Sequence, residues 1–501
     1  MSRRNGVGNL TDVWEIKPSD PFTTTITFGT LTLYGYLTNY EYDASNNLKK
    51  VTQGSQPARV FNYDSLNRLK NAANPESGTT VYDYDENGNL KTKTDARGVI
   101  TTFEYDDLKR LQSKTHSDGT PAVTYSYDTA TLGVGRLASV TSSATTLSIP
   151  SDDSSGRVKT STQLTDGISY TMSYDYNRAG NLIRQTYPSG KIVDTENDNA
   201  GRIAGIKNGS GVYYAGAAPG DADAIQYAAH GAIRTMKFGN TFWEHSAFNS
   251  RLQTTEIGLG TSSSDSSKLK LSYDYGLLVA GTPDNSKNNG NVYRQTITAP
   301  GMVLVQSYTY DELNRLLSAT ETNGATPTWA QVYKYDQFGN RRFDSGTTLP
   351  AIPPGSENTI NPEISGTNNR ISGAGYRYDS AGNLECDPSH PCGANAPFPA
   401  YYSYDADNRL TTAGGGAGSG GATYIYDGEG KRVKKLAGTV TTVFVYNISG
   451  QLLAEYSDST PAPPGGTSYF TTDNLGSNRA IMTSDGAISR HDFQPFGEAI
   501  P

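Results

Sequence analysis

The feature that most constrains this chain is a tyrosine that returns at an almost fixed interval. Tyr42, Tyr63, Tyr84, Tyr105 and Tyr127 are separated by 21, 21, 21 and 22 residues. A constant period of this length is typical of a repeat architecture, in which each unit buries its apolar face by stacking on the next one. We therefore expect the 501 residues to form one repetitive structure, although their length alone would suggest about three domains.

Residues 82–90, Tyr-Asp-Tyr-Asp-Glu-Asn-Gly-Asn-Leu, contain one complete unit of the repeat. The two tyrosines stand two residues apart, so they point to the same face of a strand. Asp85 and Gly88 occupy the first and fourth positions of a type I turn, where Asp accepts a backbone N–H and Gly follows. The unit therefore predicts a β-hairpin. Positive φ is predicted for the turn glycines Gly88, Gly180 and Gly382.

An aromatic residue, any residue, Tyr and Asp follow one another in this order ten times along the chain. The predicted structural site residues are the Tyr-Asp pairs of this motif together with Gly88. The pairs are Tyr42 and Asp43, Tyr63 and Asp64, Tyr84 and Asp85, Tyr105 and Asp106, Tyr127 and Asp128, Tyr310 and Asp311, Tyr335 and Asp336, Tyr378 and Asp379, Tyr404 and Asp405, and Tyr426 and Asp427.

The composition favours a thin, turn-rich β structure. Only 35% of the residues are hydrophobic, the 34 tyrosines far outnumber the 14 phenylalanines, and there are 53 glycines. No segment has a sustained helical period, so the helix content should be low. We expect lead-in strands over residues 1–36, repeats over 37–400, and the last repeats with a distinct C-terminal stretch over 401–501. The motif weakens between 141 and 300, and residues 205–300 are expected to be β still, with longer excursions.

These motifs resemble the YD repeats of Rhs proteins, teneurins and the shell-forming subunits of insecticidal toxin complexes. The stretch from Tyr469 to Glu498 is similar to the Rhs repeat-associated core signature, although Asn474 stands where the family usually has His. The residues that carry this part of the resemblance are Asp473, Leu475, Gly476, Arg479, Pro495, Phe496, Gly497 and Glu498.

The resemblance implies an all-β fold in which YD-repeat hairpins spiral into a hollow, β-barrel-like shell. It implies a non-enzymatic role, the encapsulation of a C-terminal toxin or effector domain of a bacterial Rhs-type polymorphic toxin. That domain would be the main partner, and it is absent from this chain. Secretion machinery and cell-surface glycans are further possible partners. The alternative is a cell-surface adhesion or carbohydrate-binding YD-repeat protein. No cofactor is expected under either hypothesis.

Charge and hydropathy bear on nucleic-acid binding, membrane spanning and cellular location. The net charge is −8 and the sequence has no run of Lys or Arg, so we expect no binding to nucleic acid. No stretch approaches the roughly 20 apolar residues of a transmembrane helix, and the N-terminus has no signal peptide. A secreted or cell-surface location is expected, with this chain as a fragment that stops before any toxin domain.

Several residue groups that resemble metal-binding or catalytic motifs also have a purely structural explanation. Residues 83–94 begin like a calcium-binding loop, but Thr94 replaces the bidentate Glu. Cys386 and Cys392 flank His390, which leaves a local disulfide, two free thiols or an incomplete zinc site open. The sequence has no nucleophile elbow or P-loop. Relatives that cleave themselves need a downstream aspartate-containing segment, so we expect no self-cleavage here.

Overall fold

The computed structural model describes residues 1–16, 24–28, 31–239, 241–344, 361–392, 400–414, 420–458 and 466–500. Parts of the predicted lead-in region, residues 17–23 and 29–30, lie outside this set. The described residues form strands and one short 3-10 helix, η1 (Asn285–Lys287), without any α-helix. The prediction of an all-β chain is confirmed. None of the described helical segments is long and apolar enough to cross a membrane.

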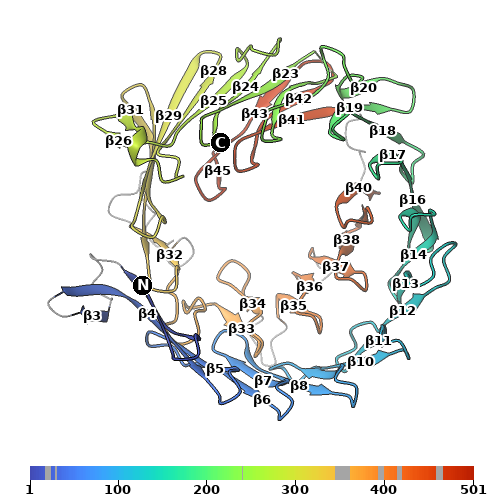
Figure 1. Cartoon of the computed structure of the whole chain (residues 1–501), viewed down its shortest axis with the longest axis vertical. Helices are drawn as coiled ribbons and strands as arrows, with labels where there is room; N and C mark the ends of the chain where they lie inside the picture. Colours follow the sequence, from blue (N-terminus) through green and yellow to red (C-terminus); the bar gives the residue numbers. More distant parts are fainter. Residues whose placement is uncertain are drawn as a thin grey trace. The chain divides into compact units, whose positions relative to one another are not determined.

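A twenty-stranded antiparallel sheet contains the first part of the chain (Figure 1). Its strands are β1 (Ser2–Arg4), β2 (Leu10–Ile16), β3 (Thr24–Phe28), β4 (Leu31–Tyr42), β5 (Leu48–Gln53), β6 (Arg59–Tyr63), β7 (Leu69–Asn74), β8 (Gly78–Tyr84), β9 (Leu90–Thr94), β10 (Ile100–Tyr105), β11 (Leu111–His116), β12 (Val123–Tyr127), β13 (Leu137–Ser142), β14 (Thr145–Asp152), β15 (Val158–Thr165), β16 (Ile168–Tyr176), β17 (Leu182–Thr186), β18 (Ile192–Asn197), β19 (Ile203–Asn208) and β20 (Tyr213–Gly216).

A ten-stranded sheet and five smaller sheets follow. The ten strands are β21 (Gln226–Tyr227), β22 (Ile233–Lys237), β23 (Trp243–Phe248), β24 (Thr254–Gly260), β25 (Leu269–Asp274), β28 (Arg294–Ala299), β29 (Met302–Tyr310), β30 (Leu316–Asn323), β31 (Thr326–Tyr335) and β32 (Arg341–Phe343). The smaller sheets contain β26 (Leu277–Val279) with β27 (Thr282–Asp284); β33 (Arg377–Tyr378) with β34 (Leu384–Cys386); β35 (Tyr402–Tyr404), β36 (Leu410–Ala413), β37 (Ala422–Tyr426), β38 (Arg432–Ala437), β39 (Val440–Tyr446) and β40 (Leu452–Ser457); β41 (Ser468–Thr472), β42 (Asn478–Thr483) and β43 (Ile488–Arg490); and β44 (Asp492–Phe493) with β45 (Ala499–Ile500).

The chain forms two compact units, and each combines early and late segments of the sequence. Unit 1 contains residues 1–172, 335–342 and 353–462, and unit 2 contains residues 173–334, 343–352 and 463–501. In unit 1, strands β4 to β15 pair with their sequence neighbours as an antiparallel meander. Every second connection of a meander lies at the same edge of the sheet, so the Tyr-Asp turns of this unit share one edge.

The late strands of unit 1 lie against one face of this meander (Figure 1). Lys114 on β11 pairs with Asp407 at 2.7 Å between Nζ and Oδ2, and Arg97 donates to the Asp405 carbonyl at 2.9 Å. The layers approach closely at Gly428, where an added Cβ would lie 2.3 Å from a methyl group of Val123. Unit 1 is therefore a two-layered β structure whose layers are joined by polar contacts.

Unit 2 holds the largest apolar core described in the chain. Leu259, Leu271 and Ile297 on three neighbouring strands of the ten-stranded sheet are fully buried. Met482 on β42 packs into the same cluster and is fully buried as well. The alternation of these strands puts every second side chain on the core face, so the small sheet of β41 to β43 covers that face.

One carboxyl group belongs to this core face. Glu244 on β23 pairs with Leu259 across the ladder, and its buried Oε2 accepts no hydrogen bond among the described residues. Burial raises the pKa of Glu244 to about 7. A buried carboxylate without a cation disfavours the charged form.

We expect unit 2 to lose stability as the pH rises from about 4.5 to 7. The folded-state pKa of Glu244 lies above its unfolded value. Between these two pKa values the folded chain keeps the Glu244 proton while the unfolded chain releases it, so the free energy of unfolding falls as the pH rises. The variant Glu244→Gln should be more stable than the native chain by about 2 kcal/mol at pH 8 and equally stable near pH 4.5. Hydrogen exchange of the β23 and β41 amides, corrected for the intrinsic pH effect, measures this difference.

The matched control is Glu256→Gln on the neighbouring strand. Burial raises the pKa of Glu256, but Lys270 and His245 lower it below its ordinary value overall, so this variant should not gain stability at pH 8. Equal protection of β23 in the native chain and in Glu244→Gln at pH 8 would contradict the assignment.

Candidate functional site: the tyrosine–aspartate turns

All but one of the ten Tyr-Asp motifs end a strand in a tight turn of the same backbone geometry. In the turn of residues 85–89, the Asp85 N–H donates to the Asn89 carbonyl at 3.0 Å and the Gly88 N–H donates to the Asp85 carbonyl at 3.1 Å. The Asp85 carboxylate accepts the Asn89 N–H at 2.8 Å. This is a type I turn followed by a residue of positive φ, which matches the twist of the two strands.

The predicted turn conformation is confirmed at all three glycines. Gly88, Gly180 and Gly382 have φ of 84°, 92° and 92°. Asn occupies the same position with positive φ in other turns, as at Asn67 and Asn314, while Lys109 adopts it with φ 61°. Lys is the less suitable residue, because its Cβ meets the backbone in this region.

The aspartate of the motif makes the same contacts in turn after turn. One carboxylate oxygen accepts backbone N–H groups two and four residues later, and the other accepts the Arg or Asn side chain at the fourth. The backbone N–H and the guanidinium of Arg157 hold the pKa of Asp153 at about 2. Asp379 makes the two contacts with Asn383 at the fourth position. The full set of contacts is shared by Asp43, Asp64, Asp106, Asp153, Asp198, Asp311, Asp336 and Asp405.

Two predicted aspartates depart from this pattern. Asp128 opens a longer loop that closes at Arg136, so its carboxylate accepts the Gly135 N–H at 2.6 Å and pairs with Arg110 of the preceding turn at 2.9 Å. Asp427 makes the backbone contacts, but burial raises its pKa.

The motif's second tyrosine sits at an irregularity of the strand pairing. The register shifts immediately before Tyr42, Tyr63, Tyr84, Tyr105 and Tyr127, and each faces the leucine that begins the return strand. The prediction that these five tyrosines occupy equivalent positions is confirmed. Tyr310, Tyr378, Tyr404 and Tyr426 sit at the same irregularity in later hairpins.

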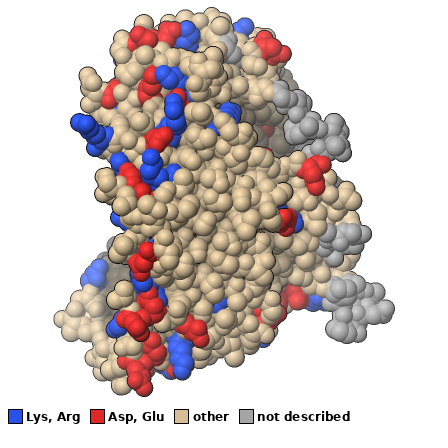
Figure 2. Space-filling view, turned by 90° about the vertical axis from the view of Figure 1, so that its right-hand side faces the viewer, with Lys and Arg blue, Asp and Glu red and all other residues tan. Residues whose placement is uncertain are grey.

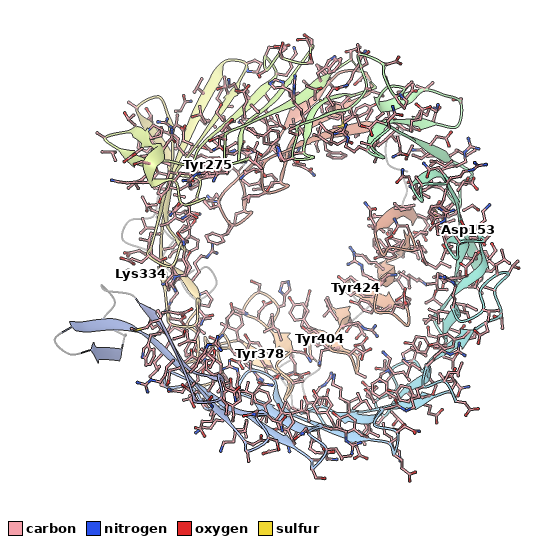
Figure 3. The ribbon with its side chains drawn as sticks, in the orientation of Figure 1. Asp153, Tyr275, Lys334, Tyr378, Tyr404 and Tyr424 are labelled. Atoms are coloured by element: carbon pink, nitrogen blue, oxygen red, sulfur yellow. A yellow bond between two sulfur atoms is a disulfide. The ribbon has the colours of Figure 1, made fainter. Side chains whose placement is uncertain are left out.

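The hydroxyl of this tyrosine reaches back to the preceding hairpin. The Tyr84 hydroxyl donates to the Leu69 carbonyl at 2.9 Å, and the Tyr105 hydroxyl donates to the Leu90 carbonyl at 3.0 Å. The same bond joins Tyr63 to Leu48, Tyr127 to Leu111, Tyr227 to Ile203, Tyr275 to Thr254, Tyr310 to Val292, Tyr404 to Leu384, Tyr426 to Leu410 and Tyr446 to Arg432. Tyr404 lies on β35 of the late layer (Figure 3).

The arginine that closes a turn covers the tyrosine of the next hairpin. The Arg110 guanidinium lies 4.3 Å from the Tyr127 ring centroid, and that of Arg68 lies 4.8 Å from Tyr84. Arg202 over Tyr227 and Arg409 over Tyr426 repeat this cation–π contact. Aspartate, arginine and the next tyrosine therefore form one continuous link between hairpins. The arginine's role was not predicted, although its recurrence as Asn-Arg-Leu in the sequence is the signal for it.

The turn charges neutralise one another. Figure 2 shows basic and acidic side chains beside one another on the face that it draws, while much of the rest of this face carries no charge. This agrees with ion pairs inside single turns, such as Asp153 with Arg157. The aspartates that open these turns are therefore already bonded. Among the described residues, no group of three His, Cys, Asp or Glu could hold a metal ion.

The C-terminal stretch has three turns of this backbone geometry, and the one from Thr483 to Ala487 lies between the other two. Asp473, Leu475 and Gly476 form a turn closed by Ser477, and Pro495, Phe496 and Gly497 form another between Gln494 and Glu498. The Phe496 ring packs edge-on against Tyr333 with centroids 5.1 Å apart.

Arg479 lies buried beside the first of these turns. It pairs with Asp492 at 2.9 Å and with Asp473 at 3.7 Å, and Asp492 also pairs with Arg490. The sequence predicted Arg479 and Asp473 as site residues but missed Asp492. A buried arginine needs such partners, because an unpaired buried charge is costly.

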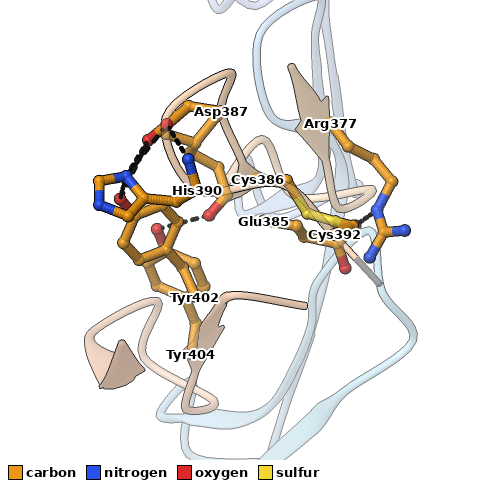
Figure 4. The surroundings of a disulfide bond; sticks show 9 residues. Arg377, Glu385, Cys386, Asp387, His390, Cys392, Tyr402 and Tyr404 are labelled. Carbon is orange, nitrogen blue, oxygen red and sulfur yellow. Dashed lines mark hydrogen bonds and ion pairs between the residues drawn. A yellow bond between two sulfur atoms is a disulfide. The ribbon is translucent and has the colours of Figure 1, made fainter. Parts of the chain in front are cut away.

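The cysteine insert forms a disulfide between Cys386 and Cys392 (Figure 4). This resolves the alternatives left open by the sequence, since thiols bonded to each other do not ligate zinc. Asp387 beside it accepts the Tyr402 hydroxyl at 3.0 Å and contacts His390 Nδ1 at 3.1 Å. Burial and Asp387 raise the pKa of Tyr402 to about 12.

Comparison with known proteins identifies the same repeat in this chain. The RHS repeat family model matches residues 63–98 and 84–121. No curated protein matches the sequence.

Solved structures match almost the whole chain. Crystal structures of TcdB2-TccC3, complete and without its hypervariable C-terminal region, have a TM-score of 0.75 at 17% and 16% identity. A Tc holotoxin pore from Photorhabdus luminescens has a TM-score of 0.76 at 16% identity. These matches cover 99% of this chain but only 27–28% of the longer chains. They establish a shared fold.

Removing one tyrosine hydroxyl should weaken the link between two hairpins. Tyr105→Phe keeps the ring and loses the bond to the Leu90 carbonyl, so the free energy of unfolding should fall by about 1 kcal/mol. Tyr42→Phe is the matched control, because the Tyr42 hydroxyl has no hydrogen bond among the described residues. Urea titration of both variants tests this, and equal loss in both would contradict the link.

Two substitutions at the turn position of positive φ should change the stability of the chain in opposite directions. Lys109→Gly removes a Cβ from positive φ and should raise stability by about 1 kcal/mol. Gly88→Val adds a β-branched residue at positive φ and should cost roughly 1–2 kcal/mol. A Cβ on Gly88 meets no atom within 4 Å, so the cost is conformational. Unchanged thermal unfolding in both variants would overturn the assignment.

Proposed function

This chain is a YD-repeat protein of the Rhs type, and from this premise we propose that it forms a shell enclosing a C-terminal toxin or effector domain. The enclosed domain would belong to the longer protein and would be held until delivery. Binding would then be physical enclosure by the wall rather than recognition at one discrete site.

The observation that carries this proposal is the fold match over 99% of the chain to TcdB2-TccC3. One of the TcdB2-TccC3 structures is described as lacking a hypervariable C-terminal region, and a holotoxin structure matches equally well. A constant wall followed by a variable region is the arrangement expected of a container whose cargo changes between proteins.

The links between hairpins suit a wall of this kind. A wall only one or two layers thick cannot rely on a deep apolar core, because both of its faces meet water. Here ten hairpins are fixed to a preceding one by a tyrosine hydroxyl, as Tyr84 is to Leu69 and Tyr105 to Leu90. Neighbouring hairpins also cover one another's edges, which protects the wall from pairing with other chains.

Two further parts of the proposal follow from the site chemistry. We place the protein outside the cytoplasm, because disulfides such as that between Cys386 and Cys392 persist mainly in oxidising compartments. We also propose that the shell acts without catalysis, since the turn aspartates are engaged by backbone N–H groups and by Arg or Asn side chains.

Protease protection tests the proposal directly. A reporter domain that proteinase K degrades rapidly is fused to the C-terminus of the chain, and its half-life under digestion is compared with that of the free reporter. Enclosure should lengthen the half-life at least tenfold. The same reporter fused to the N-terminus is the matched control and should be degraded as fast as the free domain. Equal rates for both fusions would refute enclosure by this chain.

The proposal of a non-catalytic wall predicts that the purified chain stays intact. Mass spectrometry after several days at pH 7 and pH 5 should show one species of unchanged mass. A single discrete cut that an Asp→Asn substitution abolishes would show an aspartate-dependent self-cleavage and refute this part of the proposal, without bearing on enclosure.

A further inference from the structure

A cavity of about 260 Å³ lies between the two layers of unit 1. On the side of the meander it is lined by Pro121 and Val123 at the start of β12 and by Ala144 after β13. On the side of the late layer it is lined by Tyr424 on β37, labelled in Figure 3, and by Asp427 in the turn that follows this strand. The cavity therefore combines a largely apolar lining with a carboxyl group at one end of a strand.

Among the described residues, three charged side chains line this cavity. Two of them, Asp405 and Arg409, belong to one complete turn and pair at 2.7 Å between Oδ2 and Nε. Asp427 is the third. Because the first two neutralise each other, the ionised Asp427 carboxylate gives the lining one uncompensated negative charge.

Asp427 keeps its place in the repeat but lacks the side-chain partner of the other tight Tyr-Asp turns. Its Oδ1 accepts the backbone N–H groups of Glu429 and Lys431 at 3.0 and 2.8 Å. In the other turns Oδ2 accepts an Arg or Asn side chain, as in Asp64 and Asp85. In Asp427 this oxygen accepts no hydrogen bond among the described residues. The Lys431 ammonium group bonds the Glu429 carboxylate at 3.3 Å instead.

The oxygen without a partner belongs to a buried side chain. Asp427 is 8% exposed, and burial raises the pKa of its carboxyl group. Removing a carboxylate from water without a cation is costly. A second space of about 30 Å³ beside Asp427 is large enough for a water molecule. Such a water would bond the oxygen but would not neutralise its charge.

The contact between the two layers fixes the backbone beside this carboxylate. The next residue, Gly428, lies against Val123 of β12. The Gly428 carbonyl accepts the Tyr125 hydroxyl of the same strand at 3.2 Å. Since strand and turn are joined by both packing and a hydrogen bond, the carboxyl group has a defined position, which suits a preformed site.

We propose that this cavity binds a small organic ammonium ion with an apolar ring, whose ammonium group bonds Asp427 Oδ2. An ammonium group supplies both the donor and the charge that Arg or Asn side chains and their surroundings supply in other turns. A six-carbon ring fits in a cavity of about 150 Å³, so a space of about 260 Å³ accommodates a ring with a short amine.

Other ligand classes match the cavity less well. A calcium ion takes about six to eight oxygen ligands, whereas both Asp405 oxygens are already bonded and the Thr411 hydroxyl donates to the Ser403 carbonyl. A neutral apolar molecule would leave the Asp427 carboxylate without a partner. An anion would meet the uncompensated negative charge.

Isothermal titration calorimetry of the purified chain at pH 7.5 tests this inference with three ligands of similar shape, benzylammonium, benzyl alcohol and benzoate. Benzylammonium should bind at least tenfold more tightly than benzyl alcohol, and benzoate should not bind measurably. The inference does not depend on enclosure of a C-terminal domain, so a failure of either proposal leaves the other in place.

Two substitutions in the turn separate charge from shape. Asp427→Asn should weaken benzylammonium binding at least tenfold and leave benzyl alcohol binding unchanged. The turn should survive, because Asn177 and Asn447 occupy the same position in other turns and accept the N–H group four residues later at 3.0 and 2.9 Å. Lys431→Arg restores the partner that other turns use. It should also weaken benzylammonium binding at least tenfold, although the net charge of the chain is unchanged.

Asp106→Asn is the matched control, because Asp106 opens a tight turn of the same unit and does not line the cavity. It should leave benzylammonium binding unchanged, and far-UV circular dichroism should be the same for all variants. The inference is overturned if benzylammonium does not bind or binds no more tightly than benzyl alcohol. It is also overturned if a correctly folded Asp427→Asn or Lys431→Arg variant keeps the native affinity, or if Asp106→Asn weakens binding as much as Asp427→Asn.

Discussion

The bond from a tyrosine hydroxyl to the first carbonyl of the preceding return strand is the interaction on which the rest of this structure depends. A β-hairpin alone is marginally stable in water, and the ladder fixes neighbouring strands only along their shared backbone. The hydroxyl of Tyr84 adds a second attachment, and the guanidinium of Arg68 covers the same ring. Because the turn aspartate holds that arginine, each hairpin is positioned by three side chains of two successive repeats.

This arrangement explains the unusual composition. Phenylalanine would fill the same space but would leave the carbonyl without its partner, so tyrosine is the residue that both packs and bonds. The pairing inside the turns keeps the edge of the sheet charged and well hydrated, as Arg110 does with Asp106 and Asp128. Packing, bonding and solubility are therefore served by the same few positions of the repeat.

The sequence predicted the local part of this structure because that part is periodic. Tyr105, its turn and its position in the hairpin follow from spacing and turn chemistry alone. The acceptor of the Tyr105 hydroxyl, Leu90, did not follow, because a period of two residues specifies a face and not the neighbour across it. The pairing of Arg479 with Asp492 was also missed, since two residues of opposite charge in a polar stretch have many possible partners.

The packing of the two layers of unit 1 was even harder to predict from the sequence. No pattern within a repeat indicates that Lys114 meets Asp407 or that Gly428 lies against Val123. The inserted hairpin of β26 and β27 was indicated only by the weakening of the motif between 141 and 300, and no sequence pattern indicated the burial of Glu244. These features depend on which distant segments meet, and turn chemistry carries no information about that.

The interleaving of the two units has a consequence for synthesis of the chain. Arg97 meets its acceptor 308 residues further on, and Lys114 meets Asp407 after 293 residues. Contacts between residues so far apart in the sequence form slowly, because the entropy cost of closing the long loop comes before the contact can stabilise the fold. At about 5–20 residues per second on the ribosome, the first meander would wait roughly 15–60 s for its second layer. The hairpin links between sequence neighbours are the contacts available during that interval, so the early sheet must persist on them alone.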